Sequence, residues 1–374
     1  MNRHTTFHLT GPLPSGVTVL EASAGTGKTY AIAALASRFI AEGAADIADV
    51  LAVTFSRAAT AELRLRVRER LRSTASALRA AAHGIPPTDA VDAALADAEP
   101  AEVALRAGRL DRAFADFDRA TIMTTHEFCH AMLRGLGILA PQTPQSRLAE
   151  DLGWLADEVA ADLYVQRYAH ADGPPPFGYL GEPSERDDPG ARSIARQAVA
   201  DPAVLGGTGA GGRAGERAAF AASVRAEVEA RKADLRLFSF DDQLTRLAAA
   251  LADPATGERA RSRLAERFPI VLVDEFQDTD PVQWSVLAQA FAPACTVVLI
   301  GDPKQAIYGF RGGDVHLYTA ATRQAGTLTT LRTNHRSDAG VVDAVATLFR
   351  GVALGEEIDV PDVTAARSGR RRGR

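Results

Sequence analysis

Apolar and polar positions follow two rhythms along this chain. Four short runs are rich in Val, Leu and Ile, which is typical of buried strands. They span residues 17–20, 50–54, 270–275 and 295–302. Four longer stretches repeat apolar residues at helical spacing and span residues 29–42, 58–81, 240–252 and 280–291. Strands that alternate with helices predict an α/β fold with a parallel sheet flanked by helices.

One segment interrupts this alternation. Residues 151–168 have a helical pattern, whereas the Pro- and Gly-rich stretches 171–192 and 206–217 favour loops or partly disordered chain. We therefore expect a mainly helical insertion subdomain inside a discontinuous sheet domain. The expected bounds are 148–233 for the insertion and 1–147 with 234–325 for the sheet domain.

The composition is typical of a globular protein, with 46% hydrophobic and 24% charged residues. The net charge of −5 gives no sign that the chain as a whole binds nucleic acid. It does not exclude a cluster of basic residues on one face of the protein. Two cysteines are too few for a disulfide framework. We see no signal peptide and no run near the ~18 apolar residues of a membrane span, and we expect a cytoplasmic protein with no membrane partner.

Lysine is rare in this sequence. Of 42 basic residues, the lysines are Lys28, Lys232 and Lys304. Lys28 lies in the stretch EASAGTGKTY, between a predicted strand and a predicted helix, which is the context of a phosphate-binding loop. Gly25 and Gly27 permit backbone angles that a side chain would obstruct, and a slim ammonium fits a narrow loop better than a guanidinium does. The alternative is an ordinary glycine turn.

Two groups of residues would build a nucleotide site at this loop. The predicted ATP-binding residues of the loop are Ala22, Ser23, Ala24, Gly25, Thr26, Gly27, Lys28 and Thr29. Lys28 would reach the β- and γ-phosphates, and the Thr29 hydroxyl would bind Mg²⁺. Asp274 and Glu275 follow a buried strand, where Asp274 would hold Mg²⁺ and Glu275 would orient and deprotonate water. Helix capping is the alternative for this acidic pair.

Further motifs narrow the class of protein. DEFQDTDPVQW, GDPKQAIYGFRGGD and LRTNHRSD occur in this order at residues 274–284, 301–314 and 331–338. With these motifs, the chain resembles the UvrD/Rep-like superfamily 1 DNA helicases. EASAGTGKTYAIAAL, TFSRAATAELRLRVRERL and TTHEFCHAML make it more similar to the RecB branch. The resemblance covers most of residues 17–145 and 236–340.

The resemblance implies a RecA-like P-loop fold and an ATP-dependent DNA helicase with ATP and Mg²⁺ as cofactors. It implies 3′→5′ movement on single-stranded DNA or a 3′-tailed duplex, in double-strand-break repair and recombination. It also implies RecC- and RecD-like subunits as partners. Residues 326–374 would begin a second motor domain. Since we see no later motifs, we expect a truncated or split protein with weak turnover and no unwinding by itself, and a disordered basic tail.

The resemblance also assigns roles to single residues. Gln305 would sense the γ-phosphate, and Arg336 would point at it from across a cleft. His335 stands where the family often stacks an aromatic ring on adenine. The positions that correspond to DNA contacts are Thr54, Ser56, Arg57, Thr125, His126, Tyr308, Phe310 and Arg311. Core packing is the alternative for His126 and the two aromatic residues, and Lys304 receives no role.

Two other functions stay open at this point. The chain could be a module that binds ATP and single-stranded DNA without motor activity, which the DNA dependence of its ATPase rate would distinguish. It could also be another P-loop protein. The lack of an Asn-Lys-x-Asp stretch argues against a GTPase, and the lack of a Leu-Ser-Gly-Gly-Gln-like signature argues against a transport ATPase.

Overall fold

The computed structural model of the chain divides into two compact units, residues 1–140 with 246–374 and residues 141–245. The residues that it describes are 5–140, 147–149, 151–170, 174–180, 190–200, 212–306, 315–325, 327–349, 352–354 and 358–367. Within this part of the chain, no helix combines the length and the apolar character that crossing a membrane requires.

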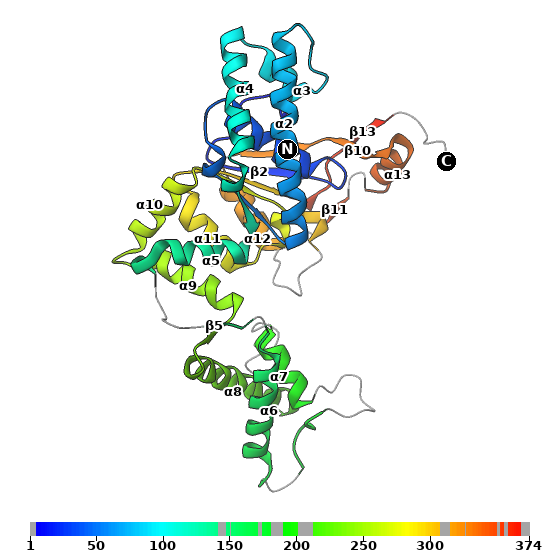
Figure 1. Ribbon diagram of the computed structural model, residues 1–374. Coiled ribbons are helices and arrows are strands. Elements are labelled where there is room, and N and C mark those ends of the chain that lie inside the picture. The colour runs from blue at the N-terminus through cyan, green and yellow to red at the C-terminus, as the bar shows by residue number, and fades with distance from the viewer. Residues whose placement is uncertain are drawn as a thin grey trace. The chain divides into compact units, whose positions relative to one another are not determined.

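A seven-stranded sheet forms the centre of the first unit (Figure 1), and all its strand pairs are parallel. The order is β1-β9-β2-β8-β7-β3-β4. The strands are β1 (Thr5–Thr6), β2 (Val17–Ala22), β3 (Val50–Thr54), β4 (Thr121–Thr124), β7 (Ile270–Val273), β8 (Thr296–Gly301) and β9 (Thr327–Leu331). The predicted parallel α/β fold is therefore confirmed. The sheet also extends past residue 325, because β9 pairs with β2.

Helices cover both faces of this sheet because its strands alternate apolar side chains between the two sides. Leu20, Ala52 and Leu272 join a core with the helices α1 (Lys28–Ala41), α2 (Arg57–Ala82), α3 (Ala90–Ala96) and α4 (Pro100–Ala115). On the other side lie α5 (Thr125–Leu136), α10 (Gly257–Arg267) and α11 (Pro281–Phe291), as Figure 1 shows. There the rings of Phe128 and Phe291 have centroids 5.9 Å apart.

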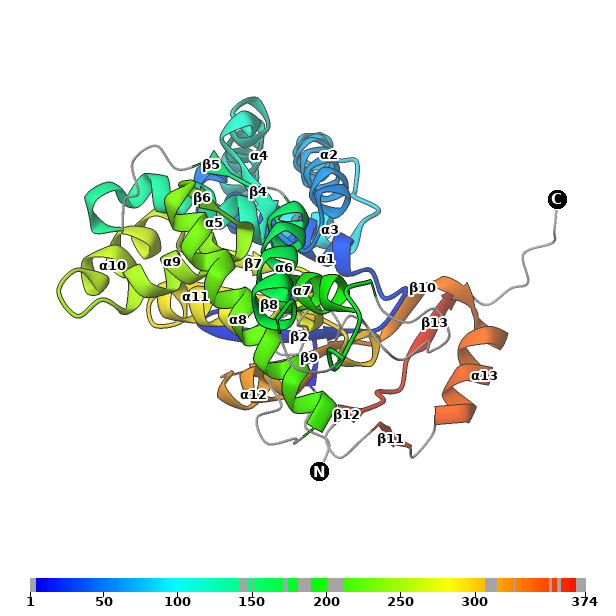
Figure 2. The same cartoon turned by 90° about the horizontal axis from the view of Figure 1, so that it is seen from below.

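Smaller elements follow the sheet in the first unit. The helix α12 (Val315–Gln324) precedes β9. After β9, strand β10 (Thr333–Asp338) pairs in parallel with β13 (Thr364–Arg367), and the two lie side by side in Figures 1 and 2. Between them come α13 (Ala339–Phe349) and the antiparallel pair of β11 (Ala353–Leu354) and β12 (Ile358–Asp359).

The second unit is built mainly from helices. They are α6 (Gly153–Tyr168), α7 (Ala191–Ala200) and α8 (Gly212–Asp234), with α9 (Phe240–Ala252) running from this unit into the first. The strands β5 (Arg147–Leu148) and β6 (Leu237–Phe238) pair in parallel. Phe177 and Phe220 are buried at its centre, with ring centroids 5.5 Å apart.

One loop prediction was wrong in this unit. Residues 212–217, at the end of a glycine-rich stretch, form the first turns of α8. The helix starts at Gly212, whose φ of 71° suits glycine. Phe220 and Val224 farther along are fully buried. Packing of that apolar face therefore outweighs the low helix propensity of the glycines.

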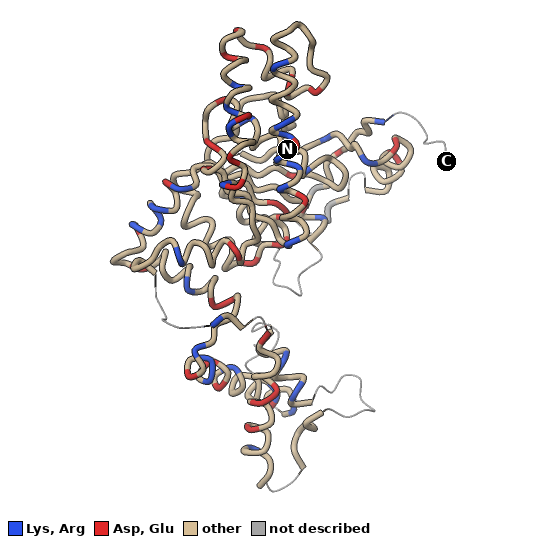
Figure 3. Tube along the Cα trace, viewed as in Figure 1, with Lys and Arg blue, Asp and Glu red and all other residues tan. Residues whose placement is uncertain are grey.

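Basic and acidic residues are interspersed along most elements, as Figure 3 shows. In α2, for example, Arg66 lies within 4 Å of both Glu62 and Glu69 on the same helix. Such exposed pairs contribute little stability, about 0–1 kcal/mol each. Arg66 of α2 is therefore paired with carboxylates of its own helix.

Candidate nucleotide-binding site

The loop between β2 and α1, which was predicted to bind phosphate, has two glycines in the left-handed backbone region. Gly25 and Gly27 have φ angles of 81° and 89°, a region that favours glycine. Thr26 is buried, and its hydroxyl donates to the carbonyl oxygen of Ser23 at 2.7 Å, which closes the turn. Thr29 is half-buried in the first turn of α1, Ala22 precedes the loop turn and Ala24 lies within it.

The start of α1 differs from the starts of α2, α5 and α11. Side chains of Ser56, Thr124 and Asp280 accept hydrogen bonds from the first turns of α2, α5 and α11. At α1, the residue before the helix is Gly27, and in the described part of the chain no side chain caps it and no acidic residue lies in its first turn. Backbone N–H groups and the helix dipole there suit an anion.

Lys28 meets Glu275 at this loop. Its Nζ lies 2.5 Å from Oε2 of Glu275, and the two side chains are 12% and 33% exposed. Glu275 follows β7 and has a φ of 50°, which is unusual for a residue with a side chain. The Gln277 side-chain nitrogen donates to the same Oε2 at 2.7 Å. The strained backbone and the two donors together fix the direction of this carboxylate.

Negative charge exceeds positive charge beside this pair. Burial and the charge of Glu275 raise the pKa of Asp274 to about 6. The same two causes raise the pKa of Asp278 to about 6, and its buried Oδ1 has no hydrogen-bond partner among the described residues. Carboxylate oxygens are ligands that Mg²⁺ prefers, although no three His, Cys, Asp or Glu side chains among the described residues gather into a metal site by themselves. Asp274 is the carboxylate at the strand end, and Thr29 adds a hydroxyl in the adjoining loop.

Strand β10 packs against the loop between β2 and α1. The side-chain nitrogen of Asn334 donates to the Ala24 carbonyl oxygen at 3.0 Å, and the His335 backbone N–H donates to the Gly25 carbonyl oxygen at 2.9 Å. A Cβ on Gly25 would lie 2.9 Å from Cβ of Arg336. Arg336 and His335 are therefore next to the loop that they were predicted to complement.

Gln305 belongs to a second polar group nearby, at the end of β8. Its side-chain nitrogen donates to Oδ2 of Asp302 at 2.5 Å. The Asp302 backbone N–H in turn donates to the side-chain oxygen of Gln277 at 2.9 Å. Gln277 thus connects Glu275 to Asp302, and through Asp302 to Gln305.

The predicted DNA-contact residues in the described chain gather at the ends of β3 and β4. Arg57 begins α2 and is exposed, with its Nε 4.0 Å from Oε1 of Glu127 in α5. His126 is half-buried in the first turn of α5. Ser56 caps α2. These side chains lie near one sheet edge because β3 and β4 are adjacent and parallel.

Two other predicted contacts have internal roles. Thr54 is 1% exposed, and its hydroxyl lies 2.5 Å from that of Thr60. Thr125 is also buried, as the first residue of α5. Tyr308, Phe310 and Arg311 lie outside the described residues.

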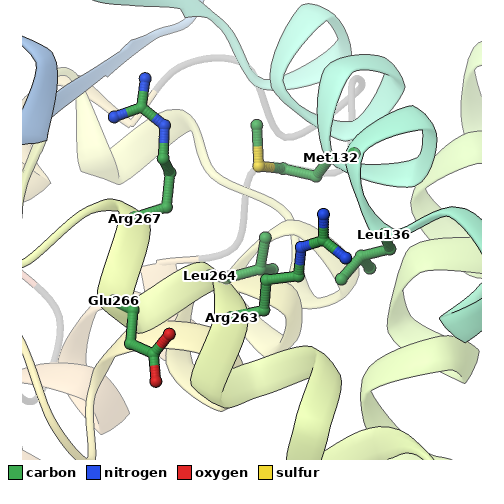
Figure 4. Close-up of a pocket in the computed structure, with 7 residues that line it drawn as sticks. Met132, Leu136, Arg263, Leu264, Glu266 and Arg267 are labelled. Carbon is green, nitrogen blue, oxygen red and sulfur yellow. The ribbon is translucent and has the colours of Figure 1, made fainter.

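A cavity of about 440 Å³ lies away from this site (Figure 4). It is lined by Met132 and Leu136 of α5 and by Arg263, Leu264, Glu266 and Arg267 of α10. Arg267 donates to the carbonyl oxygen of Ala48, just before β3 begins. The cavity therefore lies at the start of β3, opposite the strand ends that carry the loop.

The sequence patterns missed several residues of the site. Asn334 and Gln277 lie inside recognised motifs but had no role, and the pairing of Glu21 with Lys304 at 3.3 Å was not foreseen. Glu21 is only 4% exposed although it is a carboxylate directly before the loop. A charged residue that ends an otherwise apolar strand was the available signal.

Comparison with known proteins gives one consistent family. A family model described as the UvrD/REP helicase N-terminal domain matches residues 7–169 and 191–326. RecBCD enzyme subunit RecB of Mycobacterium tuberculosis is 43% identical over 371 residues, which are 98% of this chain and 33% of that protein. The same subunit of Mycolicibacterium smegmatis is 44% identical over 375 residues, with the same coverage.

A more distant match covers less of the chain. RecBCD enzyme subunit RecB of Escherichia coli K12 is 42% identical over 130 residues, 34% of this chain and 11% of that protein. The chain thus spans about a third of the length of the mycobacterial relatives.

Proposed function

Since the chain belongs to the UvrD/REP helicase N-terminal domain family, we propose that it is the ATP-binding part of a RecB-type DNA helicase. The observation that carries this proposal is the 2.5 Å contact between Lys28 and Glu275, which are 247 positions apart in sequence. It brings the ammonium of the phosphate-binding loop and the carboxylate of the second motif to one end of one sheet.

ATP would bind with its phosphates around the first turn of α1. The N–H groups of the loop and Lys28 would hold the β- and γ-phosphates, and the strand β10 would present Arg336 beside them. Thr29 and Asp274 would hold Mg²⁺, which supplies charge neutralisation at the phosphates when bound. His335 would lie near the base.

Glu275 would orient the attacking water and accept its proton. Lys28 and Gln277 both donate to Oε2, so the other carboxylate oxygen is the one available to water. Gln305 would exchange its bond to Asp302 for one to the terminal phosphate. It would thereby report the nucleotide state to the ends of β3 and β4, where Ser56, Arg57 and His126 would meet single-stranded DNA.

The wider role that we propose for this chain is taken from its similarity to the RecB subunits. Residues 1–147 and 234–325 would form the motor domain, together with β9, and residues 148–233 would form the insertion. Apart from β9, residues 326–374 would begin a second motor domain. We propose 3′→5′ movement in double-strand-break repair with RecC- and RecD-like subunits. A cytoplasmic location stays a prediction.

Equilibrium binding of a fluorescent ATP analogue with Mg²⁺ tests the site. Lys28→Met should weaken binding about 100-fold, because charge-assisted hydrogen bonds to the phosphates are worth roughly 1.5–3 kcal/mol. Glu275→Gln should keep binding and lose at least about 100-fold in hydrolysis rate. Lys232→Met in the second unit is the matched control and should leave binding unchanged. A wild-type chain that binds no nucleotide would refute the proposal.

The alternative of a non-motor binding module has its own test. The ATPase rate is measured with and without single-stranded DNA under the same conditions. A motor domain should respond to DNA, and Arg57→Ala should weaken that response while ATP binding stays the same. Binding of both ligands without any change in rate would favour the non-motor module.

A further inference from the structure

A buried group of three charged residues lies where β2 and β8 end. Nζ of Lys304 is 3.3 Å from Oε1 of Glu21 and 2.6 Å from Oδ1 of Asp302. The side chains of Lys304, Glu21 and Asp302 are 16%, 5% and 2% exposed. Glu21 directly precedes the phosphate-binding loop, and Asp302 directly follows the β8 strand.

The group contains more acid than base. Two carboxylates share the Lys304 ammonium, and a buried carboxylate is strongly unfavourable unless it is paired. Lys304 is also one of only three lysines in the chain. Since arginine is the usual basic residue in this sequence, a lysine here indicates that a compact ammonium is needed between the two carboxylates.

Asp302 divides its oxygens between two partners. Oδ1 receives the Lys304 ammonium and the Lys304 backbone N–H at 3.2 Å, whereas Oδ2 receives the Gln305 side-chain nitrogen at 2.5 Å. The turn at Phe276–Asp278 approaches the end of β8 closely, which keeps this arrangement compact. A Cβ on Gly301 would lie 2.7 Å from the side-chain oxygen of Gln277.

We propose that Lys304 is a positioning residue for Gln305, which it allows to leave Asp302 for the terminal phosphate of a bound nucleoside triphosphate. The proposal rests on the function proposed above. A hydrogen bond from an amide to an unneutralised carboxylate is strong. Lys304 weakens the hold of Asp302 on Gln305 by sharing its charge. It also keeps the carboxylate paired after Gln305 has left, so the exchange requires less free energy.

The test compares affinity for a non-hydrolysable ATP analogue with affinity for ADP, by calorimetry with Mg²⁺ on the full chain. Only the triphosphate offers Gln305 its partner. The wild type should prefer the triphosphate, and Lys304→Met should reduce this preference about 10-fold, which corresponds to roughly one hydrogen bond. ADP affinity should stay within about twofold. Lys304→Arg keeps the positive charge but not the compact ammonium, so it should retain only part of the preference.

A double variant tests whether Lys304 acts through Gln305. Gln305→Ala should lose the preference by itself, and adding Lys304→Met should reduce it no further. Tyr318→Phe is the matched control in the same surroundings. Its hydroxyl is buried without a hydrogen-bond partner among the described residues, and burial with the charges of Glu21 and Asp302 raises its pKa well above the usual value. This variant should keep the preference.

Stability is measured on the same samples because Lys304→Met leaves two carboxylates without their cation. If that variant does not fold, Glu21→Gln combined with Lys304→Met removes one carboxylate and should show the same loss of preference. Lower stability with an unchanged preference would overturn the proposal, as would a further loss in the Gln305→Ala background. Failure of the wild type to bind either nucleotide would instead refute the proposed function and this inference with it.

Discussion

The side-chain nitrogen of Asn334 lies 3.0 Å from the carbonyl oxygen of Ala24, and this hydrogen bond joins positions 310 residues apart. The side-chain oxygen of Asn334 accepts the backbone N–H groups of Arg336 and Ser337 at 2.8 and 2.9 Å. One amide therefore shapes the turn that carries Arg336 and attaches that turn to the phosphate-binding loop.

Replacing Asn334 should separate these two contributions. Asn334→Asp keeps the acceptor for Arg336 and Ser337 but loses the donor to Ala24. We expect about 1 kcal/mol lower stability, which is typical of one lost hydrogen bond, and about 10-fold weaker binding of an ATP analogue. Asn334→Ala should lose more of both. Urea unfolding and equilibrium binding measure the two effects. Equal behaviour of the two variants would contradict the separate roles.

The close approach of β10 to Gly25 predicts that Gly25→Ala lowers stability more than the backbone angle of Gly25 alone would. A Cβ there would lie 2.9 Å from atoms of Asn334 and Arg336, and φ is 81°. Gly84 has a similar φ of 83°, but a Cβ there would meet nothing within 4 Å. Gly84→Ala should therefore cost about 1–2 kcal/mol for the backbone alone. Gly25→Ala should cost more and weaken ATP-analogue binding.

Thermal unfolding and equilibrium binding on both glycine variants check this comparison. Gly84→Ala should leave nucleotide affinity unchanged, since it is far from the loop in the α2–α3 connection. If the two variants lose the same stability and the same affinity, β10 does not restrict the loop.

A charged group beside the loop predicts a dependence of stability on pH. Tyr30 in α1 donates to Oδ2 of Asp89 at 2.5 Å, and Arg70 donates to Oδ1 at 2.7 Å. Burial would raise the pKa of Asp89, but the hydrogen bonds from Arg70 and Tyr30 outweigh it and lower the pKa from 3.8 to about 2. The folded state thus binds this proton less tightly than the unfolded state does.

The direction of the pH dependence follows from this difference in proton affinity between the folded and unfolded states. The contribution of Asp89 is fully present above about pH 5 and is lost progressively as the pH falls through 2. It amounts to roughly 2 kcal/mol for a shift of this size. Wild type and Asp89→Asn should therefore differ most in urea-unfolding stability near pH 6 and converge only as the pH falls below about 2. Burial raises the pKa of the neighbouring Asp92, whose opposite contribution is present in both proteins. A difference that does not change with pH would contradict the assignment.

The two cysteines should be inert in the folded chain. Both thiols are free and buried. Burial, with a smaller effect from Asp280, raises the pKa of Cys129 from 9.0 to about 12. This lowers its thiolate fraction about a thousandfold near pH 8. Labelling with a thiol reagent should be slow in the native state and rapid for two thiols in urea. The Cys295→Ser variant isolates Cys129, and rapid native labelling of that variant would contradict its burial.

Much of the fold could be predicted because apolar runs determine the central strands. The runs at 17–20, 50–54 and 295–302 all lie in the sheet, and the helix expected at 58–81 is observed as Arg57–Ala82. Strand β9 was not predicted because its sequence, TLTTL, is rich in threonine. Thr329 and Thr330 are nevertheless buried, since β-branched side chains pack well on a sheet.

The residues of the proposed nucleotide site could be named from the sequence, but the contacts that support them could not. The pattern around Lys28 and the pair at Asp274 and Glu275 indicated which residues to examine. That Asn334 reaches Ala24, or that Lys304 lies between Glu21 and Asp302, depends on tertiary packing of distant segments. Periodicity reports only local structure, so such pairings need coordinates.

The position of β9 between β1 and β2 has a consequence for synthesis at the ribosome. The strand at Thr5–Thr6 forms its sheet hydrogen bonds with residues 329 and 330. Strand β1 must therefore wait until residues 329 and 330 have been made, and the sheet edge beside β2 stays open until then. An exposed parallel edge of this kind is a point where a nascent chain is vulnerable to aggregation.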